Sequence, residues 1–260
     1  MKNAVATKQN LVFGVHSVLE KLAASPQDVI EILLSDVSDR AVLRQIHDQA
    51  ARLRLRIISA SPKLLDRLAG GQKHQGVAAR IEGYRYLPFT ELLDQVALPS
   101  RKELVLILDG VTDPRNFGAL LRTADGAGLC YVVIPKDRAA EATPVVVKAS
   151  AGAAHHVKIA RVANLRRAIL DLKKLDYWVV GLDASSPESI YDREYPSRLG
   201  IVLGSEGKGI RPVILRECDF LASIPMLGKI ASLNVSVAGA VVLYELLRQR
   251  RSTERDAGRT

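Results

Sequence analysis

Three polar segments, each directly after an apolar run typical of a β-strand, carry residue types that can do chemistry. The first is LDGVTDPRNFGALLRTADGAG, residues 108–128. Its Asn116 stands at the mouth of an expected helix, where an amide side chain caps the helix or faces a ligand. Arg122 follows six residues later, about 120° around the helix axis. An arginine beside an apolar helix face needs an anion or carbonyl groups, from a ligand or from Asp109 or Asp113.

The other two segments bring glycines, a carboxylate and small polar side chains. IVLGSEGKGI (201–210) joins a strand to a three-glycine loop, whose backbone can approach a ligand closely. It matches neither the Walker A loop nor the GxGxxG fingerprint, and a purely structural turn is an equal alternative. IPMLGKIASLNVSVAGAVVLYEL (224–246) places Lys229, Ser232 and Asn234 before a helix that starts with small residues. These side chains are either helix caps or part of a ligand site.

The elements that must position these segments alternate through the second half of the chain. We expect strands at 103–110, 131–135, 157–160, 177–182, 200–204 and 220–224, and helices at 116–127, 143–151, 163–175 and 234–250, with a further helix entered at Pro212. Such alternation predicts an α/β fold with a mainly parallel sheet covered by helices on both faces. Ligands of these sheets bind beyond the carboxyl ends of the strands, where the three polar segments begin.

The first half of the chain predicts a second, smaller α/β domain. Helices are expected at 14–24, 39–53 and 62–69, and strands at 29–35, 54–59 and 76–82. Two prolines and mixed polarity then interrupt the pattern, apart from one short helix near 89–97. We therefore divide the chain into an N-terminal domain (1–82), a linker (83–102), a catalytic domain (103–250) and a basic, polar tail (251–260).

Composition narrows the classes of function. The chain has 260 residues, of which 48% are hydrophobic, so it can bury a core. No apolar run approaches the ~18 residues of a membrane span, and the N-terminus lacks a signal-peptide block, so we expect a cytoplasmic protein. A net charge of +9 favours a polyanionic partner, while 5% aromatic residues argue against a platform that stacks a long single strand. Two cysteines, Cys130 and Cys218, predict reduced, mostly buried thiols and no metal cluster.

Taken in order, the three segments resemble the three motifs of the SpoU, or TrmH-like, family of RNA ribose methyltransferases in the SPOUT superfamily. The matching stretches are DGVTDPRNFGALLRTA, VLGSEGKGI and IPMLGKIASLNVSVAGAVVLYE. Each is modest alone, but the three together are highly specific, and none departs from the family at a motif position. In the first half, GVHSV (14–18) and KHQGV (73–77) resemble the RNA-binding domain of the subgroup that methylates a guanosine ribose of 23S ribosomal RNA. The similarity covers about residues 11–248.

The resemblance implies a fold and a cofactor that spacing alone does not give. It implies a C-terminal SPOUT domain with a deep trefoil knot, an N-terminal domain like ribosomal protein L30e, and a homodimer. S-adenosylmethionine is the implied cofactor, without a metal. Matched by position, the implied cofactor-binding residues are Gly204, Ile224, Met226, Ser232 and Leu233, and the implied catalytic residues are Asn116, Arg122, Glu206, Ser232 and Asn234.

The implied reaction needs a 2′-hydroxyl aligned with the methyl donor and relieved of its proton. Guanidinium stays protonated, so we expect Arg122 to clamp a phosphate and stabilise the developing alkoxide, rather than act as a base. Asn116 is expected to orient Arg122 or the ribose, and Glu206 to hold a motif loop. Ser232 and Asn234 are expected to order the cofactor loop. For RNA binding we single out His16, Arg54, Lys73 and His74.

Two other readings stay open. Within the same enzyme class, the substrate is a transfer RNA or a ribosomal adenosine, because those enzymes share the catalytic motifs. From another class, the chain is a non-catalytic RNA-binding factor in ribosome assembly. The intact polar motif residues speak against this second reading, and binding of S-adenosylmethionine discriminates the two.

Overall fold

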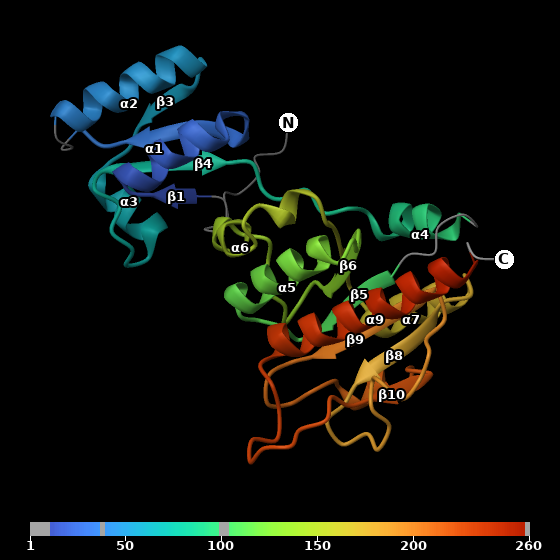
Figure 1. Ribbon diagram of the computed structural model, residues 1–260. Helices are drawn as coiled ribbons and strands as arrows, with labels where there is room; N and C mark the ends of the chain where they lie inside the picture. Colours follow the sequence, from blue (N-terminus) through green and yellow to red (C-terminus); the bar gives the residue numbers. More distant parts are fainter. Residues whose placement is uncertain (1–10, 37–39, 99–103, 258–260) are drawn as a thin grey trace. The chain divides into compact units, whose positions relative to one another are not determined.

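The computed structural model describes residues 11–36, 40–98 and 104–257 and consists of two compact units, residues 1–84 and 85–260 (Figure 1). Both units are α/β, as the alternating pattern predicts. The N-terminal unit contains β1 (Leu11–Phe13), α1 (Val15–Ala24), the 3-10 turn η2 (Pro26–Asp28), β2 (Val29–Leu34), α2 (Arg40–Leu53), β3 (Arg56–Ser59), α3 (Pro62–Ala69) and β4 (Val77–Ile81).

The sheet of the N-terminal unit has the strand order β1-β4-β2-β3, in which only β2 and β3 run parallel. Apolar side chains alternate across it. One face packs on α1 and α2 through Val18 and Ile46, and the other packs on α3 through Leu65. Strand β1 was not predicted, since a three-residue strand is too short to show a period-2 pattern.

The C-terminal unit contains a six-stranded, all-parallel sheet in the order β10-β8-β9-β5-β6-β7. Its elements are α4 (Phe89–Ala97), β5 (Leu104–Asp109), α5 (Pro114–Gly126), β6 (Tyr131–Pro135), α6 (Pro144–Ala149), the 3-10 turn η3 (Ala153–His155), β7 (Lys158–Val162), α7 (Leu165–Lys173), β8 (Trp178–Leu182), β9 (Leu199–Gly204), α8 (Pro212–Leu215), β10 (Phe220–Ala222) and α9 (Val235–Ala257). The prediction of a parallel sheet is confirmed. Its central strands β5, β6 and β9 are almost wholly buried, as a sheet covered on both faces requires.

Helices cover both faces of this sheet. One face packs on α4, α7 and α8, through residues such as Leu92, Ile169 and Ile214. Residues 85–98, placed in a linker by the sequence pattern, therefore belong to the core of the C-terminal unit. Helices α5 and α9 lie side by side on the other face (Figure 1).

Glycines allow the helices on that face to approach closely. A Cβ atom at Gly239 of α9 would lie 2.4 Å from Leu120 of α5 and 2.9 Å from Leu203 of β9. A Cβ atom at Gly118 would lie 2.5 Å from Ala149 of α6. Gly126 lies next to the Tyr244 hydroxyl, so α5 and α9 run in the same direction, with both N-termini at the carboxyl edge of the sheet.

Two of the differences between predicted and observed helix boundaries have a clear physical cause. Helix α5 begins at Pro114, with Asp113 as its cap: the Arg115 amide donates to Asp113 Oδ1 at 2.6 Å. A proline suits the first helical position, so the cap moves ahead of Asn116 and leaves that side-chain amide for other partners. Helix α9 continues to Ala257, past the predicted end at 250, because RSTERDA holds neither glycine nor proline.

Candidate active site

A cluster of three polar side chains joins all three sequence segments at the carboxyl edge of the sheet. Asn116 Nδ2 donates to Glu206 Oε1 at 2.7 Å, and Asn234 Nδ2 donates to the same oxygen at 2.5 Å. Asn234 Nδ2 also donates to Asn116 Oδ1 at 3.2 Å. These residues lie at the start of α5, after β9 and before α9, so the fold brings together side chains up to 118 residues apart. We call Asn116, Glu206 and Asn234 the amide–carboxylate cluster.

Asn234 has a second role as the cap of α9. Its Oδ1 accepts hydrogen bonds from the Ser236 amide at 2.9 Å and from Ser236 Oγ at 2.6 Å. The oxygen therefore faces the helix while Nδ2 faces Glu206, which leaves one orientation for the side-chain amide. The side chain that caps α9 thus also belongs to the amide–carboxylate cluster.

Hydrogen bonds fix the loop after β9, residues 204–209, both within the loop and just after it. Backbone bonds between Ser205 and Gly209 close it at 3.0 and 2.9 Å, and a Cβ atom at Gly204 would lie 2.1 Å from the Gly209 carbonyl carbon. Arg211, just after the loop, donates its amide and its Nε to the carboxylate of the buried Asp109, at 2.9 and 2.7 Å. Gly204 is thus required by the fold of the loop itself.

Sequence reasoning missed Arg211. It named Asp109 as a partner for Arg122, but the structure pairs Asp109 with Arg211, whose guanidinium also reaches Oδ1 at 2.6 Å. The signal was present, since a buried strand-end carboxylate needs a cation and Arg211 follows the neighbouring strand. Choosing between the two arginines required the strand order, which places β5 beside β9.

A small cavity of about 220 Å³ adjoins the amide–carboxylate cluster. It is lined by Gly110, Val111, Thr112, Asp113, Asn116, Ser205, Glu206 and Val235. All of them come from the turns after β5 and β9 and from the first turns of α5 and α9, where ligands of parallel sheets are expected. The cavity places polar groups beside a space that can hold a reacting hydroxyl.

Arg122 is separate from the cluster in the single chain. It lies on the exposed side of α5, about 9 Å along the helix from Asn116, and lines neither described cavity. No hydrogen bond or ion pair joins it to a side chain in the described part of the chain. Its exposed guanidinium is therefore accessible to an anion from outside this subunit's described residues.

The loop before α9 carries the residues matched to cofactor binding. Ile224 and Met226 are half-buried, whereas Ser232 and Leu233 are exposed. No hydrogen bond holds the backbone of residues 224–233, among the residues that the structure describes. Leu227, Ile230 and Leu233 of the same loop expose apolar side chains. Unused amide and carbonyl groups next to apolar side chains suit a ligand with a flat heterocycle.

In the N-terminal unit, the motifs that contain residues 14–18 and 73–77 pack against one another. The Gly14 amide donates to the Val77 carbonyl at 3.1 Å, and the Val15 amide, at the start of α1, donates to Gln75 Oε1 at 3.2 Å. His74 is engaged on both ring nitrogens: Nδ1 accepts from the Gly76 amide at 3.1 Å, so Nε2 carries a proton for Asp66 Oδ1 at 2.9 Å. His74 therefore shapes this loop.

Of the other residues singled out for RNA binding, His16 and Lys73 are exposed on the two joined motifs. Arg54 is exposed elsewhere, in the turn before β3. Since β3 runs parallel to β2, with Arg56 opposite Glu31, Arg54 lies at the start of these strands. The KHQGV loop lies at their other end, where Val77 pairs with Leu34. Arg54 is thus not part of the surface that His16 and Lys73 share.

Two family models match the chain. The SpoU rRNA Methylase family covers residues 103–244, and RNA 2'-O ribose methyltransferase substrate binding covers residues 11–87. The first spans more than half of the sequence and contains the first two motifs and all but the last residue of the third. The chain belongs to the SpoU family. The predicted membership is confirmed, and the amide–carboxylate cluster lies inside the matched SpoU region.

Individual SpoU relatives extend the similarity over both units. The 23S rRNA (guanosine-2'-O-)-methyltransferase RlmB of Haemophilus influenzae is 40% identical over 92% of this chain and 97% of the relative. RlmB of Xanthomonas campestris is 42% identical over 94% of this chain and 98% of the relative. The SpoU methyltransferase AviRb of Streptomyces viridochromogenes, solved with the cofactor AdoMet, is 25% identical, with a TM-score of 0.65 and coverage of 93% and 90%.

The described part of this SpoU chain offers neither a membrane span nor a metal-ligand cluster. Among the described residues, no helix combines the length and apolar character needed to cross a bilayer. Within the same part of the chain, no group of three or more His, Cys, Asp or Glu residues is placed to hold a metal ion. Neither cysteine forms a disulfide in the described part of the chain, and both are half-buried, less buried than the sequence suggested.

Proposed function

We propose that this protein transfers a methyl group from S-adenosylmethionine to the ribose 2′-hydroxyl of a guanosine in 23S ribosomal RNA. One observation carries the proposal: relatives named for this reaction are about 40% identical over nearly the whole of both chains, including the substrate-binding unit. Catalytic motifs are shared across substrates, so the support for a 23S RNA substrate comes from the high identity of these relatives through both units. The basic net charge of +9 agrees with an RNA partner.

The residues of the loop before α9 fit S-adenosylmethionine. The backbone of Ile224 and Leu233 is free to bond the edge of the adenine, and the exposed apolar side chains of the loop can cover its faces. Gly204, Met226 and Ser232 complete the set that we assign to cofactor binding. When bound, the cofactor supplies an electrophilic methyl group, so the reaction needs no metal.

The protein's own task is to position the ribose and accept charge. We assign the placement of the 2′-hydroxyl to Asn116, beside the small cavity, and the support of Asn116 to Glu206 and Asn234. Glu206 Oε1 already accepts two amide hydrogen bonds, which suits a holding role better than proton transfer. Arg122 clamps a substrate phosphate and stabilises the developing alkoxide; the proton leaves to a phosphate or to water.

A homodimer would bring Arg122 of one subunit to the amide–carboxylate cluster of the other. Val237 and Tyr244 of α9 are exposed apolar residues seven positions apart, hence on one face of the helix. Tyr244 lies next to Gly126, one turn beyond Arg122 on α5, so the apolar face and Arg122 share one side of the unit. We propose that two copies pair through this side and that each Arg122 serves the partner's cluster.

Three further parts of the proposal come from the family resemblance. We propose that the C-terminal unit contains the deep trefoil knot and that the N-terminal unit has the L30e-like fold, with His16 and Lys73 on its RNA surface. His74 holds that surface, while Arg54 adds a separate RNA contact. We also propose that the N-terminal unit binds the RNA, that the C-terminal unit from residue 85 onward is the catalytic domain, and that the protein works in the cytoplasm.

Mass-spectrometric mapping of ribose methylation in ribosomal RNA, from cells with and without the gene, tests the function. We expect one 2′-O-methylguanosine of 23S RNA, in the peptidyl-transferase region, to disappear and to return when the gene is restored. Loss of a mark in transfer RNA, or at a ribosomal adenosine, would instead favour the alternative substrates. Calorimetry with S-adenosylmethionine addresses the non-catalytic reading, because an assembly factor without activity would give no binding heat.

A further inference from the structure

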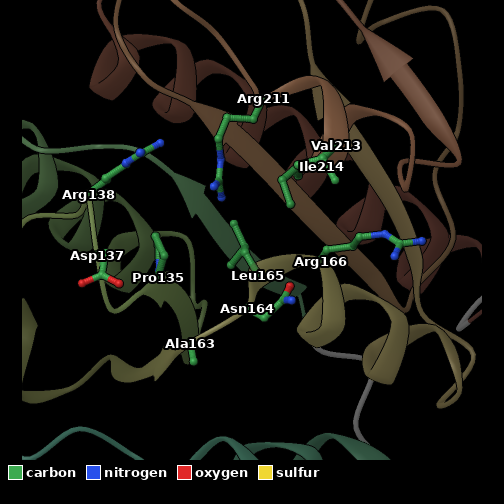
Figure 2. Close-up of a pocket in the computed structure, with 10 residues that line it drawn as sticks. All are labelled: Pro135, Asp137, Arg138, Ala163, Asn164, Leu165, Arg166, Arg211, Val213 and Ile214. Atoms are coloured by element: carbon green, nitrogen blue, oxygen red, sulfur yellow. The ribbon is translucent and has the colours of Figure 1, made fainter.

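A second cavity of the C-terminal unit lies outside the candidate active site. Its volume is about 630 Å³, within the range of about 300–1,000 Å³ typical of sites that hold a whole small ligand. It opens beyond the carboxyl ends of β6 and β7, at the face of the sheet that carries α7 and α8. We call it the arginine cavity, because Arg138, Arg166 and Arg211 line it (Figure 2).

The three arginines differ in what already binds them. Arg166 donates its Nε to Glu217 at 2.6 Å, and in Figure 2 it points away from the other two. Arg211 uses Nε and one Nη for Asp109, which leaves three of its five N–H groups. Arg138 is exposed and has no hydrogen-bond or ion-pair partner among the described residues. Its guanidinium extends toward that of Arg211 in Figure 2.

Asp109 already compensates the charge of Arg211, whereas Arg138 has no ion-pair partner among the described residues, so Arg138 supplies the positive charge that attracts an anion to this space. The planar fork of arginine matches a phosphate with two parallel hydrogen bonds. Asp137 also lines the cavity, but no ion pair joins it to Arg138. The rest of the lining combines Asn164 with apolar residues, of which Val213 is 38% exposed while Leu165 and Ile214 are almost wholly buried. The site thus offers a phosphate contact next to a surface on which a base or sugar can pack.

The arginine cavity and the small cavity are neighbours. Asp109, which holds Arg211, is followed directly by Gly110 in the wall of the small cavity. Gly110 in turn lies against Ser205, since a Cβ atom at Gly110 would be 3.3 Å from the Ser205 Cβ. The strand end of β5 is therefore the partition between the two spaces.

We propose that the arginine cavity binds an RNA nucleotide adjacent to the methylated one, with its phosphate on Arg138 and the free edge of Arg211. This inference rests on the proposed function, since it assigns a subsite to the same RNA. It explains why the partition carries a buried carboxylate: Asp109 orients the exposed Arg211 for the neighbouring phosphate. Arg138 is then a positioning residue for the RNA strand that enters the site.

The test is RNA binding, measured by fluorescence anisotropy at several salt concentrations with a labelled 23S RNA fragment and the full-length protein. We expect Arg138→Gln to weaken RNA binding about five- to tenfold and to lower the salt slope by about 0.7, the value for one single-strand phosphate contact. The kcat at saturating RNA and the affinity for S-adenosylmethionine should stay within about twofold of wild type. The RNA affinity of Arg138→Lys should lie between those of wild type and Arg138→Gln, because lysine keeps the positive charge but lacks the planar guanidinium fork.

Arg167→Gln is the matched control, since Arg167 lies on α7 beside the cavity, carries the same charge and does not line the cavity. Unchanged RNA affinity and salt slope in Arg138→Gln, or equal weakening in Arg167→Gln, would overturn the proposal. Should Arg138→Gln fail to fold, Arg138→Gly suits the backbone there, with φ at 58°. A wild-type protein that binds RNA without methylating it would refute the function while leaving this binding test valid.

Discussion

Asn116 and Asn234 lie 118 residues apart in sequence, yet their side chains are hydrogen-bonded to each other at 3.2 Å and share one oxygen of Glu206. Both stand at the N-terminal ends of helices that run in the same direction on one face of the sheet. The positive ends of two helix dipoles therefore converge on the Glu206 carboxylate. This arrangement allows each polar residue of the cluster to be tested separately.

Asn234 can be tested for its two roles with two substitutions. Asn234→Ser keeps an oxygen that caps α9 but removes the amide that bonds Glu206, so stability should change little while kcat falls at least tenfold. Asn234→Ala loses both, and should also lower the free energy of unfolding by about 1 kcal/mol. Thermal unfolding and single-turnover methylation measure the two effects. Equal stability of the two variants would contradict the capping role.

Glu206→Gln distinguishes holding from proton transfer. Glutamine keeps an oxygen that can accept from Asn116 and Asn234, so we expect kcat within about tenfold of wild type and an unchanged pH profile. Glu206→Ala removes the acceptor and should lower kcat about a hundredfold. If the glutamine variant were as inactive as the alanine variant, Glu206 would be assigned to the proton transfer itself.

Arg122 offers a test of both chemistry and assembly. Arg122→Lys should lower kcat at least a hundredfold with unchanged S-adenosylmethionine affinity, because it loses the fork geometry. Near-normal turnover would refute the clamp.

Subunit mixing tests where Arg122 acts. Arg122→Ala and Asn116→Ala proteins, each inactive alone, should regain about a quarter of wild-type activity when their subunits are exchanged, since half of the dimers are mixed and each has one intact site. No recovery after confirmed exchange would place Arg122 and Asn116 of one chain in the same site.

The two thiols should differ in reactivity. Burial raises the pKa of Cys218 to about 12 from an ordinary value of 9.0. The raised pKa means less thiolate at any pH below it, roughly a thousandfold less at pH 8, and thiolate is the reactive form. Iodoacetamide at pH 8 should label Cys130 and spare Cys218 in the folded protein, as peptide mass spectrometry can show. Labelling at equal rates would mean that Cys218 is more accessible than its packing indicates.

The sequence by itself determined the class of the molecule. Alternating apolar runs and helical periods were enough to predict an α/β fold with a parallel sheet, because these patterns depend on which side chains are buried. Three motifs in order were enough for the SpoU family, because each constrains a separate loop.

Only the tertiary structure decided which distant side chains are ion-paired or hydrogen-bonded to one another. Asp109 pairs with Arg211 rather than with Arg122, because the strand order places β9 beside β5. The side chain of His74 is hydrogen-bonded to Asp66 and to the Gly76 amide. Arg54 precedes β3, at the end of the sheet opposite to the loop that holds His74. The sequence pattern alone did not separate these two residues. A local pattern specifies the period and burial of a segment, but a hydrogen bond between distant residues depends on strand order and register.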